Sequence, residues 1–240
     1  MKVLFVSGAS RGFGKAVALQ FSRSTLSFDL IVLTSRKGPD CPDLQRTRAA
    51  ITSPARVLLK KLDYSQPNSG IESVLQDIAG AVTLVWINNV GTLGSLGKLN
   101  TIDMDQLRQT FQINAFGPIE ATLKATQSTE SIVVNVSSLA AIEPFEAWGM
   151  YCASKAASEM LHRVLATESN VRVLNYAPGP MDTDMQLEIR RDMPECALRT
   201  VFLDMHKQNK LVDPMDSALN LLRIVELNEF NSGCHVDYYD

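Results

Sequence analysis

The sequence predicts an α/β fold in which a seven-stranded, mainly parallel sheet is covered by helices on both faces. Seven short segments along the 240 residues are predicted to be strands; most are rich in apolar residues, which is typical of strands buried on both faces of a sheet. They lie at 3–6, 30–34, 57–62, 82–87, 132–136, 171–176 and 235–239. Helix-compatible segments separate them, and a glycine-rich turn follows the first. We expect one domain spanning residues 1–240.

The first run ends in the turn Ser7-Gly8-Ala9-Ser10-Arg11-Gly12-Phe13-Gly14, and a helical pattern follows. Glycines let a backbone approach a pyrophosphate closely, and the pyrophosphate then lies at the helix N-terminus. The order of strand, turn and helix predicts a Rossmann-like, doubly wound dinucleotide-binding domain, although a flexible turn without a ligand is the alternative. The candidate cofactor-binding residues here are Gly8, Ser10, Arg11, Gly12, Phe13 and Gly14.

The second and third runs end in polar residues that suit the adenosine half of a dinucleotide. Ser35-Arg36-Lys37 follows the second run, where an acid would bind the ribose 2′-hydroxyl of NAD. Because Arg36 suits a 2′-phosphate instead, the sequence favours NADP, with Ser35 and Arg36 in its site. Asp63 and Tyr64 follow the third run, where an acid can meet the adenine amino group. Solvated loop charges are the alternative.

Amide side chains mark the middle of the chain. Asn88-Asn89-Val90-Gly91 follows the fourth run, and there Asn89 can brace neighbouring backbone while Gly91 leaves room for a cofactor. An ordinary polar turn is the alternative. Residues 103–126 predict one long helix containing Asn114, and an amide in such a helix commonly bonds to nearby backbone.

A tyrosine and a lysine form the candidate catalytic pair. The fifth run opens into Ser137-Ser138, and a helix predicted to extend through residue 167 carries Tyr151 and Lys155. A spacing of four puts both side chains on one helix face. A phenol with a pKa near ~10 is a poor acid at neutral pH, and a nearby ammonium should lower that pKa. Alone, the spacing is weak evidence because it occurs by chance in many helices, and an amphipathic helix surface is then the favoured interpretation.

The last third is less regular. Residues 177–183 follow the sixth run, and 185–209 have weak periodicity and many charges, which predicts a mobile segment on the substrate side. Residues 217–226 suit a final helix.

Composition excludes several classes of function. A net charge of −3 gives no reason to expect nucleic acid or an anionic membrane as a partner. No run approaches the ~18 apolar residues of a membrane span. Four cysteines without paired spacing suggest reduced thiols in a cytoplasmic protein, and three histidines leave little for a metal site, so none is expected.

The motifs together resemble one family. In chain order they are Gly8, Gly12 and Gly14, the run 88–91, Asn114, Ser138, Tyr151 and Lys155. In this combination nearly the whole chain resembles the short-chain dehydrogenase/reductase family, with Val90 where that family usually has alanine.

The resemblance implies a NADP-dependent oxidoreductase acting on C=O and CH–OH groups. Ser138 would bind the substrate carbonyl and Tyr151 would protonate its oxygen. Lys155 would lower the pKa of Tyr151 and hold the nicotinamide ribose, while Asn114 would support a water that relays protons to Lys155. Further cofactor contacts implied at the nicotinamide are Pro178, Met181, Thr183 and Met185. A homodimer built on the helices around Asn114 and Tyr151 is also implied.

The second half of the chain resembles more closely the family members that reduce 6-acyl pterins. The residues that carry this resemblance are 135–139, 144–145, 148, 151–153, 171–180, 182–185, 210–213 and 232–237. Asp237 would accept two hydrogen bonds, from the amino group and ring N–H of a pterin, as carboxylates do with guanidinium. Trp148 and Gly179 would contact the substrate. Two alternatives stay open: a related reductase of diketones or quinones, and a NADP-binding regulatory protein with a silent site.

Overall fold

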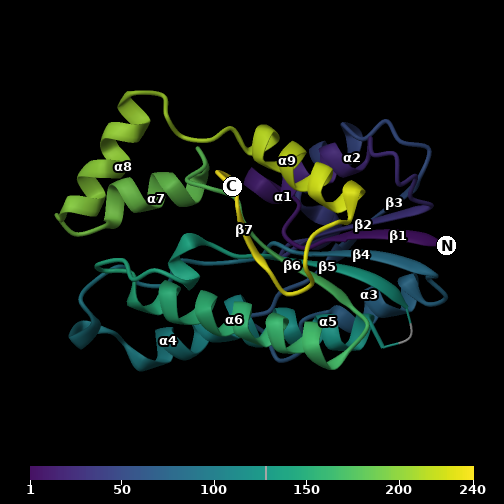
Figure 1. Ribbon diagram of the computed structural model, residues 1–240, viewed down its shortest axis with the longest axis horizontal. Coiled ribbons are helices and arrows are strands. Elements are labelled where there is room, and N and C mark those ends of the chain that lie inside the picture. Colours follow the sequence, from purple (N-terminus) through teal and green to yellow (C-terminus); the bar gives the residue numbers. More distant parts are fainter. Residues whose placement is uncertain (128) are drawn as a thin grey trace.

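The computed structural model describes residues 1–127 and 129–240, and its seven strands form one sheet with the order β3-β2-β1-β4-β5-β6-β7 (Figure 1). Every neighbouring pair is parallel, which confirms the predicted fold class. The strands are β1 Lys2–Val6, β2 Leu30–Ser35, β3 Arg56–Lys61, β4 Thr83–Asn88, β5 Glu130–Val136, β6 Arg172–Ala177 and β7 His235–Asp237.

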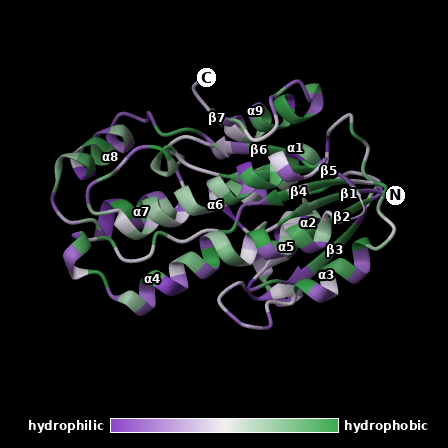
Figure 2. Cartoon of the chain, turned by 60° about the horizontal axis from the view of Figure 1, so that its bottom comes forward, coloured by the Kyte–Doolittle hydropathy of each residue, from purple (hydrophilic) through white to green (hydrophobic). Residues whose placement is uncertain are grey.

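Helices cover both faces of the sheet (Figure 1). One face packs against α1 Gly12–Phe21, α2 Pro42–Ala49 and α9 Pro214–Leu227. The other packs against α3 Ile71–Ile78, α5 Gly117–Ala125 and α6 Gly149–Glu168, with α4 Met104–Phe111 beside α6. All six residues of β2 are buried, as expected for a strand enclosed between two layers. Figure 2 shows the strands mostly hydrophobic and the outer helices mixed.

The predicted helix over 103–126 is interrupted. A π-helical turn, Gln112–Phe116, separates α4 from α5, and it contains Asn114. Such turns insert an extra residue into a helix and frequently occur at functional sites. The apolar pattern does not reveal the interruption, because helical backbone continues on both sides of it.

The prediction for 185–209 missed two helices, α7 Asp184–Asp192 and α8 Ala197–Lys207. In Figure 1 they lie beyond the carboxyl ends of the central strands. α7 buries only Gln186 and Ile189, and α8 buries no residue fully. Helices that bury so little carry a weak periodic signal and depend on tertiary contacts. Across the described ranges, no helix combines the length and apolar character needed to cross a membrane.

The strand order reverses between β1 and β4. Loops that leave two such strands diverge to opposite faces of the sheet, and ligands of doubly wound folds bind at that point. The loops after β1, β4 and β5 carry the glycine turn, Asn89 and Ser138. The fold therefore gathers the candidate residues at one edge of the sheet.

Candidate active site

The glycine turn between β1 and α1 has a geometry that favours glycine. Gly8 and Gly12 have φ of +69° and +52°, in the left-handed region. A Cβ at Gly14 would lie 2.3 Å from the carbonyl oxygen of Gly8 and 2.4 Å from Asn89 Nδ2. Asn89 Nδ2 donates to the carbonyl of Ser7 at 2.9 Å, so the predicted bracing of neighbouring backbone is present.

The first turn of α1 is open to an anion. It contains no acidic residue, and no side-chain cap from the described residues occupies its N–H groups. Ser10 lies in the loop before α1. Phe13 lies in the first turn of α1 and is buried in the core.

Arg11 also contacts the substrate-side segment. Its guanidinium forms a 2.7 Å ion pair with Asp184 at the start of α7, and both side chains are about two-thirds exposed. A Cβ placed on Gly12 would come within 3.4 Å of Thr183 Cγ2. The glycine turn and the N-terminus of α7 therefore lie against each other, which brings Gly12 and Thr183 together.

Of the residues predicted to bind the adenosine half of the dinucleotide, some are exposed and others are buried. Arg36 is exposed just beyond β2, and Ser35 is buried with its hydroxyl directed at the carbonyl of Gly38. The Asp63 carboxylate accepts hydrogen bonds from the backbone and hydroxyl of Ser65. Tyr64 belongs to the core, and burial raises the pKa of its phenol.

Asn114 ties the π-helical turn to the loop after β4. Its amide donates to the carbonyl of Thr92 and accepts from the N–H of Thr92, both at 2.8 Å. It also donates to Ser154 Oγ on α6 at 2.9 Å. A Cβ added to Gly91 would lie 3.5 Å from Lys155 Nζ and 3.6 Å from Asn114 Oδ1, so these three residues meet at one point.

Ser138, Tyr151 and Lys155 converge at the end of β5. Tyr151 and Lys155 lie one turn apart near the start of α6, both buried. Lys155 Nζ donates to the carbonyl oxygen of Val136 at 2.7 Å and lies 5.7 Å from the centroid of the Tyr151 ring. Ser138 Oγ accepts from the N–H of Ala140 at 3.2 Å.

The expected lowering of the Tyr151 pKa is not observed. Burial raises the pKa of Tyr151 to about 12, although a hydrogen bond with Ser138 opposes the rise. Burial likewise lowers the pKa of Lys155 to about 8. The prediction was wrong because it considered charge proximity alone, whereas removing both groups from water favours their neutral forms.

Trp148 joins the tyrosine to the helices beyond the sheet. Its ring lies edge-on to Tyr151 and is stacked on Phe202 of α8, with centroid distances of 5.5 and 5.7 Å. Met185 packs against the same apolar cluster. The cluster places an aromatic wall directly beside the candidate proton donor.

The segment after β6 is held by backbone contacts. Gly179 has φ of +77°, and a Cβ there would lie 3.2 Å from Val212. Met181 forms a parallel bridge with Val212, and the carbonyl of Pro178 accepts from Ser217 Oγ at 3.0 Å. These contacts fix the path of the chain from β6 to α7.

Comparison with known proteins identifies the family. The family model for short chain dehydrogenase matches residues 2–194. The chain belongs to the short-chain dehydrogenase family. It is an oxidoreductase, and this family uses a nicotinamide dinucleotide as cofactor.

Individual relatives match over almost the full length. Sepiapterin reductase from Mus musculus is 36% identical, over 99% of this chain and 97% of its own. A benzil reductase from Bacillus cereus is 26% identical, over 97% of each chain. Among solved structures, the KRED1-Pglu enzyme superposes with a TM-score of 0.83 at 28% identity, over 98% of this chain and all of that one.

In this short-chain dehydrogenase, Asp237 is the last residue of β7. It therefore lies at the carboxyl ends of the strands, as the glycine turn, Asn89 and Ser138 do. It pairs with Ala177 of β6, and the preceding row joins Val136, Tyr176 and Val236. Two strand spacings, roughly 10 Å, therefore separate the backbones of Asp237 and the end of β5. Asp237 Oδ1 accepts from the N–H of Tyr239 at 3.1 Å.

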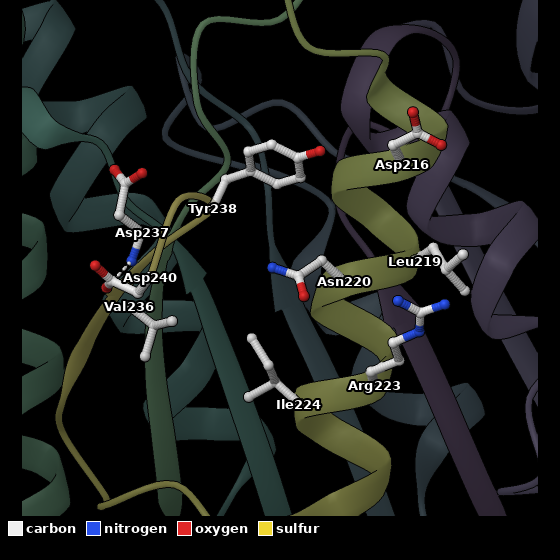
Figure 3. Close-up of a pocket in the computed structure, with 9 residues that line it drawn as sticks. All are labelled: Asp216, Leu219, Asn220, Arg223, Ile224, Val236, Asp237, Tyr238 and Asp240. Atoms are coloured by element: carbon white, nitrogen blue, oxygen red, sulfur yellow. Dashed lines mark hydrogen bonds between the residues drawn. The ribbon is translucent and has the colours of Figure 1, made fainter.

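A cavity of about 660 Å³ lies between α9 and the end of β7. Asp237 is one of its lining residues, but its carboxylate and the ring of Tyr238 point in different directions (Figure 3). Val236, whose side chain packs with the core on the α1 and α9 face, also lines the cavity. Alternation along the strand therefore directs Asp237 toward the α6 face.

The short-chain dehydrogenase site also has an apolar wall that the sequence did not predict. Trp148 and Tyr151 pack with three apolar side chains: Ile189 in α7, Met193 just after α7, and Phe202 in α8. The spacing of Ile189 and Met193, four residues apart, was the available signal. Many charges around them obscured it.

Proposed function

We propose that this protein is a NADPH-dependent reductase of the side-chain carbonyls of 6-acyl pterins. Sepiapterin and 6-pyruvoyl-tetrahydropterin are the proposed substrates, reduced in the last steps toward tetrahydrobiopterin. The observation that carries the proposal is the full-length similarity to sepiapterin reductases, at 36% identity in the mouse relative. The position of Asp237 at the active edge of the sheet supports it.

The residues around the switch point fit the cofactor. The turn through Gly8 and Gly12 leaves backbone room for a pyrophosphate, and the open first turn of α1 offers N–H groups to it. Arg36 lies exposed at the end of β2, where a 2′-phosphate would require positive charge. NADPH, when bound, supplies the hydride.

Four side chains carry the proposed proton chemistry. Ser138 donates a hydrogen bond to the substrate carbonyl oxygen, and Tyr151 gives that oxygen a proton. A raised pKa keeps Tyr151 in its protonated, donating form at neutral pH. Lys155 provides positive charge that stabilises the resulting phenolate and holds the nicotinamide ribose. Asn114 supports a water that returns protons toward Lys155.

The remaining predicted residues position the two ligands. Thr183 binds the carboxamide, with Pro178, Met181 and Met185 around the nicotinamide. For the substrate, the Trp148 cluster and Gly179 enclose the pterin ring. Asp237 accepts hydrogen bonds from the pterin amino group and ring N–H, which aims the side-chain carbonyl at Ser138 and Tyr151.

We also propose a cytoplasmic homodimer. The helices around Asn114 and Tyr151 carry apolar side chains that stay well exposed in one chain, and burying such side chains favours association. They are Phe116, Leu123, Met160, Leu161 and Val164.

A reductase of simple diketones is the second candidate, favoured by the match to benzil reductase over 97% of both chains. An assay following NADPH absorbance with sepiapterin and with a simple diketone separates the two. The pterin proposal predicts a clearly higher kcat/KM for sepiapterin. Reduction of the diketone with no reduction of sepiapterin would replace it with the second candidate.

A further inference from the structure

Glu159 continues the catalytic stripe of α6. Tyr151, Lys155 and Glu159 follow one another at intervals of four, so they lie on one face of the helix. Glu159 is only 3% exposed. None of the proposed proton steps uses this buried carboxylate.

One oxygen of Glu159 joins two strands. Its Oε2 accepts from Ser137 Oγ at 2.6 Å and from His235 Nδ1 at 2.8 Å. Ser137 follows β5 and His235 begins β7, while β6 lies between these strands. Glu159 therefore connects β5 to β7 across the intervening strand.

Each partner lies within two residues of one that would touch the substrate. Ser137 directly precedes Ser138. His235 lies two positions before Asp237, and a period of two puts both side chains on the α6 face of β7. The link through Glu159 thus runs from the carbonyl-binding end of the site to the pterin-binding end.

Stability alone explains this link poorly. Glu159 Oε1 and His235 Nε2 are buried and have no hydrogen-bond partner among the residues described. Burial raises the pKa of Glu159, but His235 and Ser137 outweigh it and leave that pKa below its usual value. Buried ion pairs often contribute little net stability, and apolar replacements of similar volume can be as stable. Holding Ser137 and His235 in a fixed relative position is a more specific role for Glu159.

We propose that Glu159 is a positioning residue that fixes the separation between Ser138 and Asp237, and so makes the site selective for pterins over small ketones. This inference rests on the proposed function. A pterin must reach both ends of the site at once, whereas a small diketone needs only Ser138 and Tyr151.

The test compares Glu159→Ala with Glu159→Gln. The glutamine oxygen can occupy the position of Oε2 and accept both hydrogen bonds, while its NH2 group takes the place of Oε1, which has no partner among the residues described. Glu159→Ala should raise KM for sepiapterin about tenfold, because a small displacement of a binding group greatly weakens its contact with the substrate. For a diketone, kcat/KM should change less than about twofold. Glu159→Gln should restore most of the sepiapterin KM.

Ser158→Ala is the matched control, because it removes a neighbouring buried hydrogen bond to Asn135 and leaves the link intact. It should affect both substrates equally. If Glu159→Ala does not fold, His235→Leu removes the link from β7, and His235→Asn retains a donor near the position of Nδ1. The leucine variant should lose sepiapterin selectivity, and the asparagine variant should keep it.

Binding provides a readout independent of turnover. In a titration followed by tryptophan fluorescence, the affinity for sepiapterin should weaken about tenfold in Glu159→Ala, with NADPH binding unchanged. Equal losses for sepiapterin and diketone, or no loss for either, would overturn the role of Glu159 and leave the proposed function standing. Wild-type protein that neither binds nor reduces sepiapterin would overturn both.

Discussion

Lys155 Nζ lies 5.7 Å from the centroid of the Tyr151 ring and donates its hydrogen bond to the carbonyl of Val136 at 2.7 Å. The two side chains share one face of α6, and burial shifts their pKa values toward the neutral forms, to about 12 for Tyr151 and about 8 for Lys155. At pH 7 the protein therefore holds an un-ionised phenol beside a charged ammonium. That is the combination a proton donor requires.

Replacing Tyr151 by phenylalanine removes the donor and keeps the ring that packs against Trp148. Turnover should fall by about 10² or more, within the usual contribution of a general acid. NADPH binding, measured by fluorescence titration, should stay within about twofold, because the cofactor site is otherwise intact. Near-normal turnover would mean that another group supplies the proton.

The pH dependence of kcat/KM for NADPH should follow the ionisation of Lys155. The pKa of this lysine is lowered to about 8, so it is charged below that pH and loses its charge as the pH rises through it. Since kcat/KM reflects ionisations of the free enzyme, kcat/KM for NADPH should decline above about pH 8. Lys155→Arg keeps its charge and should lack this decline. A flat wild-type profile up to pH 10 would contradict the role of Lys155.

Arg36 should determine the cofactor preference. A charge-assisted contact to a 2′-phosphate is worth roughly 1.5–3 kcal/mol, so wild-type protein should prefer NADPH over NADH by at least about tenfold. Arg36→Asp should reverse or abolish this preference in steady-state assays. Arg23→Asp, which changes another exposed arginine beyond the far end of α1, is the control and should leave it unchanged. Equal use of both cofactors by wild-type protein would refute the assignment.

His162 should make the apoprotein sensitive to acid. It is fully buried on α6 between the carbonyl of Ser158 and the amide of Asn88, and burial lowers its pKa to about 4. The unfolded chain takes up the proton near pH 6.5, so this residue lowers the free energy of unfolding as pH falls from 6.5 toward 4. Its contribution at pH 5 is a loss of about 2 kcal/mol relative to pH 7.5.

His162→Gln keeps polar contacts and cannot titrate. In urea denaturation, the stability difference between wild-type protein and this variant should shift by about 2 kcal/mol in favour of the variant at pH 5. A difference independent of pH would show that His162 titrates normally.

The sequence predicted the sheet and the glycine turn well because both have strong local signals. The run 30–34 consists of aliphatic residues up to Thr34, and Gly8, Gly12 and Gly14 lie in the turn after the first strand. The helices α7 and α8 were missed because Ile189 and Met193 are surrounded by charges. The π-helical turn at Asn114 was missed because it leaves the helical pattern intact.

Other features depend on burial and register, which no local pattern contains. The pKa of Tyr151 was predicted in the wrong direction because the degree of burial was unknown. The link from Glu159 to His235 joins residues 76 positions apart, and it exists only because β7 pairs with β6 in one particular register. Neither residue type nor spacing could have indicated it.

The central claim, that the protein recognises a pterin through Asp237, predicts a substrate-selective loss. Asp237→Asn retains an oxygen for the N–H of Tyr239 but replaces one acceptor by a donor, so it separates recognition from folding. Asp240→Ala, which removes the acceptor for the N–H of Asp237, controls for the conformation of this segment.

The most direct measurement is the ratio of kcat/KM for sepiapterin to kcat/KM for a simple diketone, in wild-type protein, Asp237→Asn and Asp237→Ala. Loss of a charged hydrogen-bonding partner should lower the ratio by about tenfold or more in both variants, with diketone reduction nearly unchanged. A ratio that stays constant, whether both activities fall together or neither falls, would contradict the account.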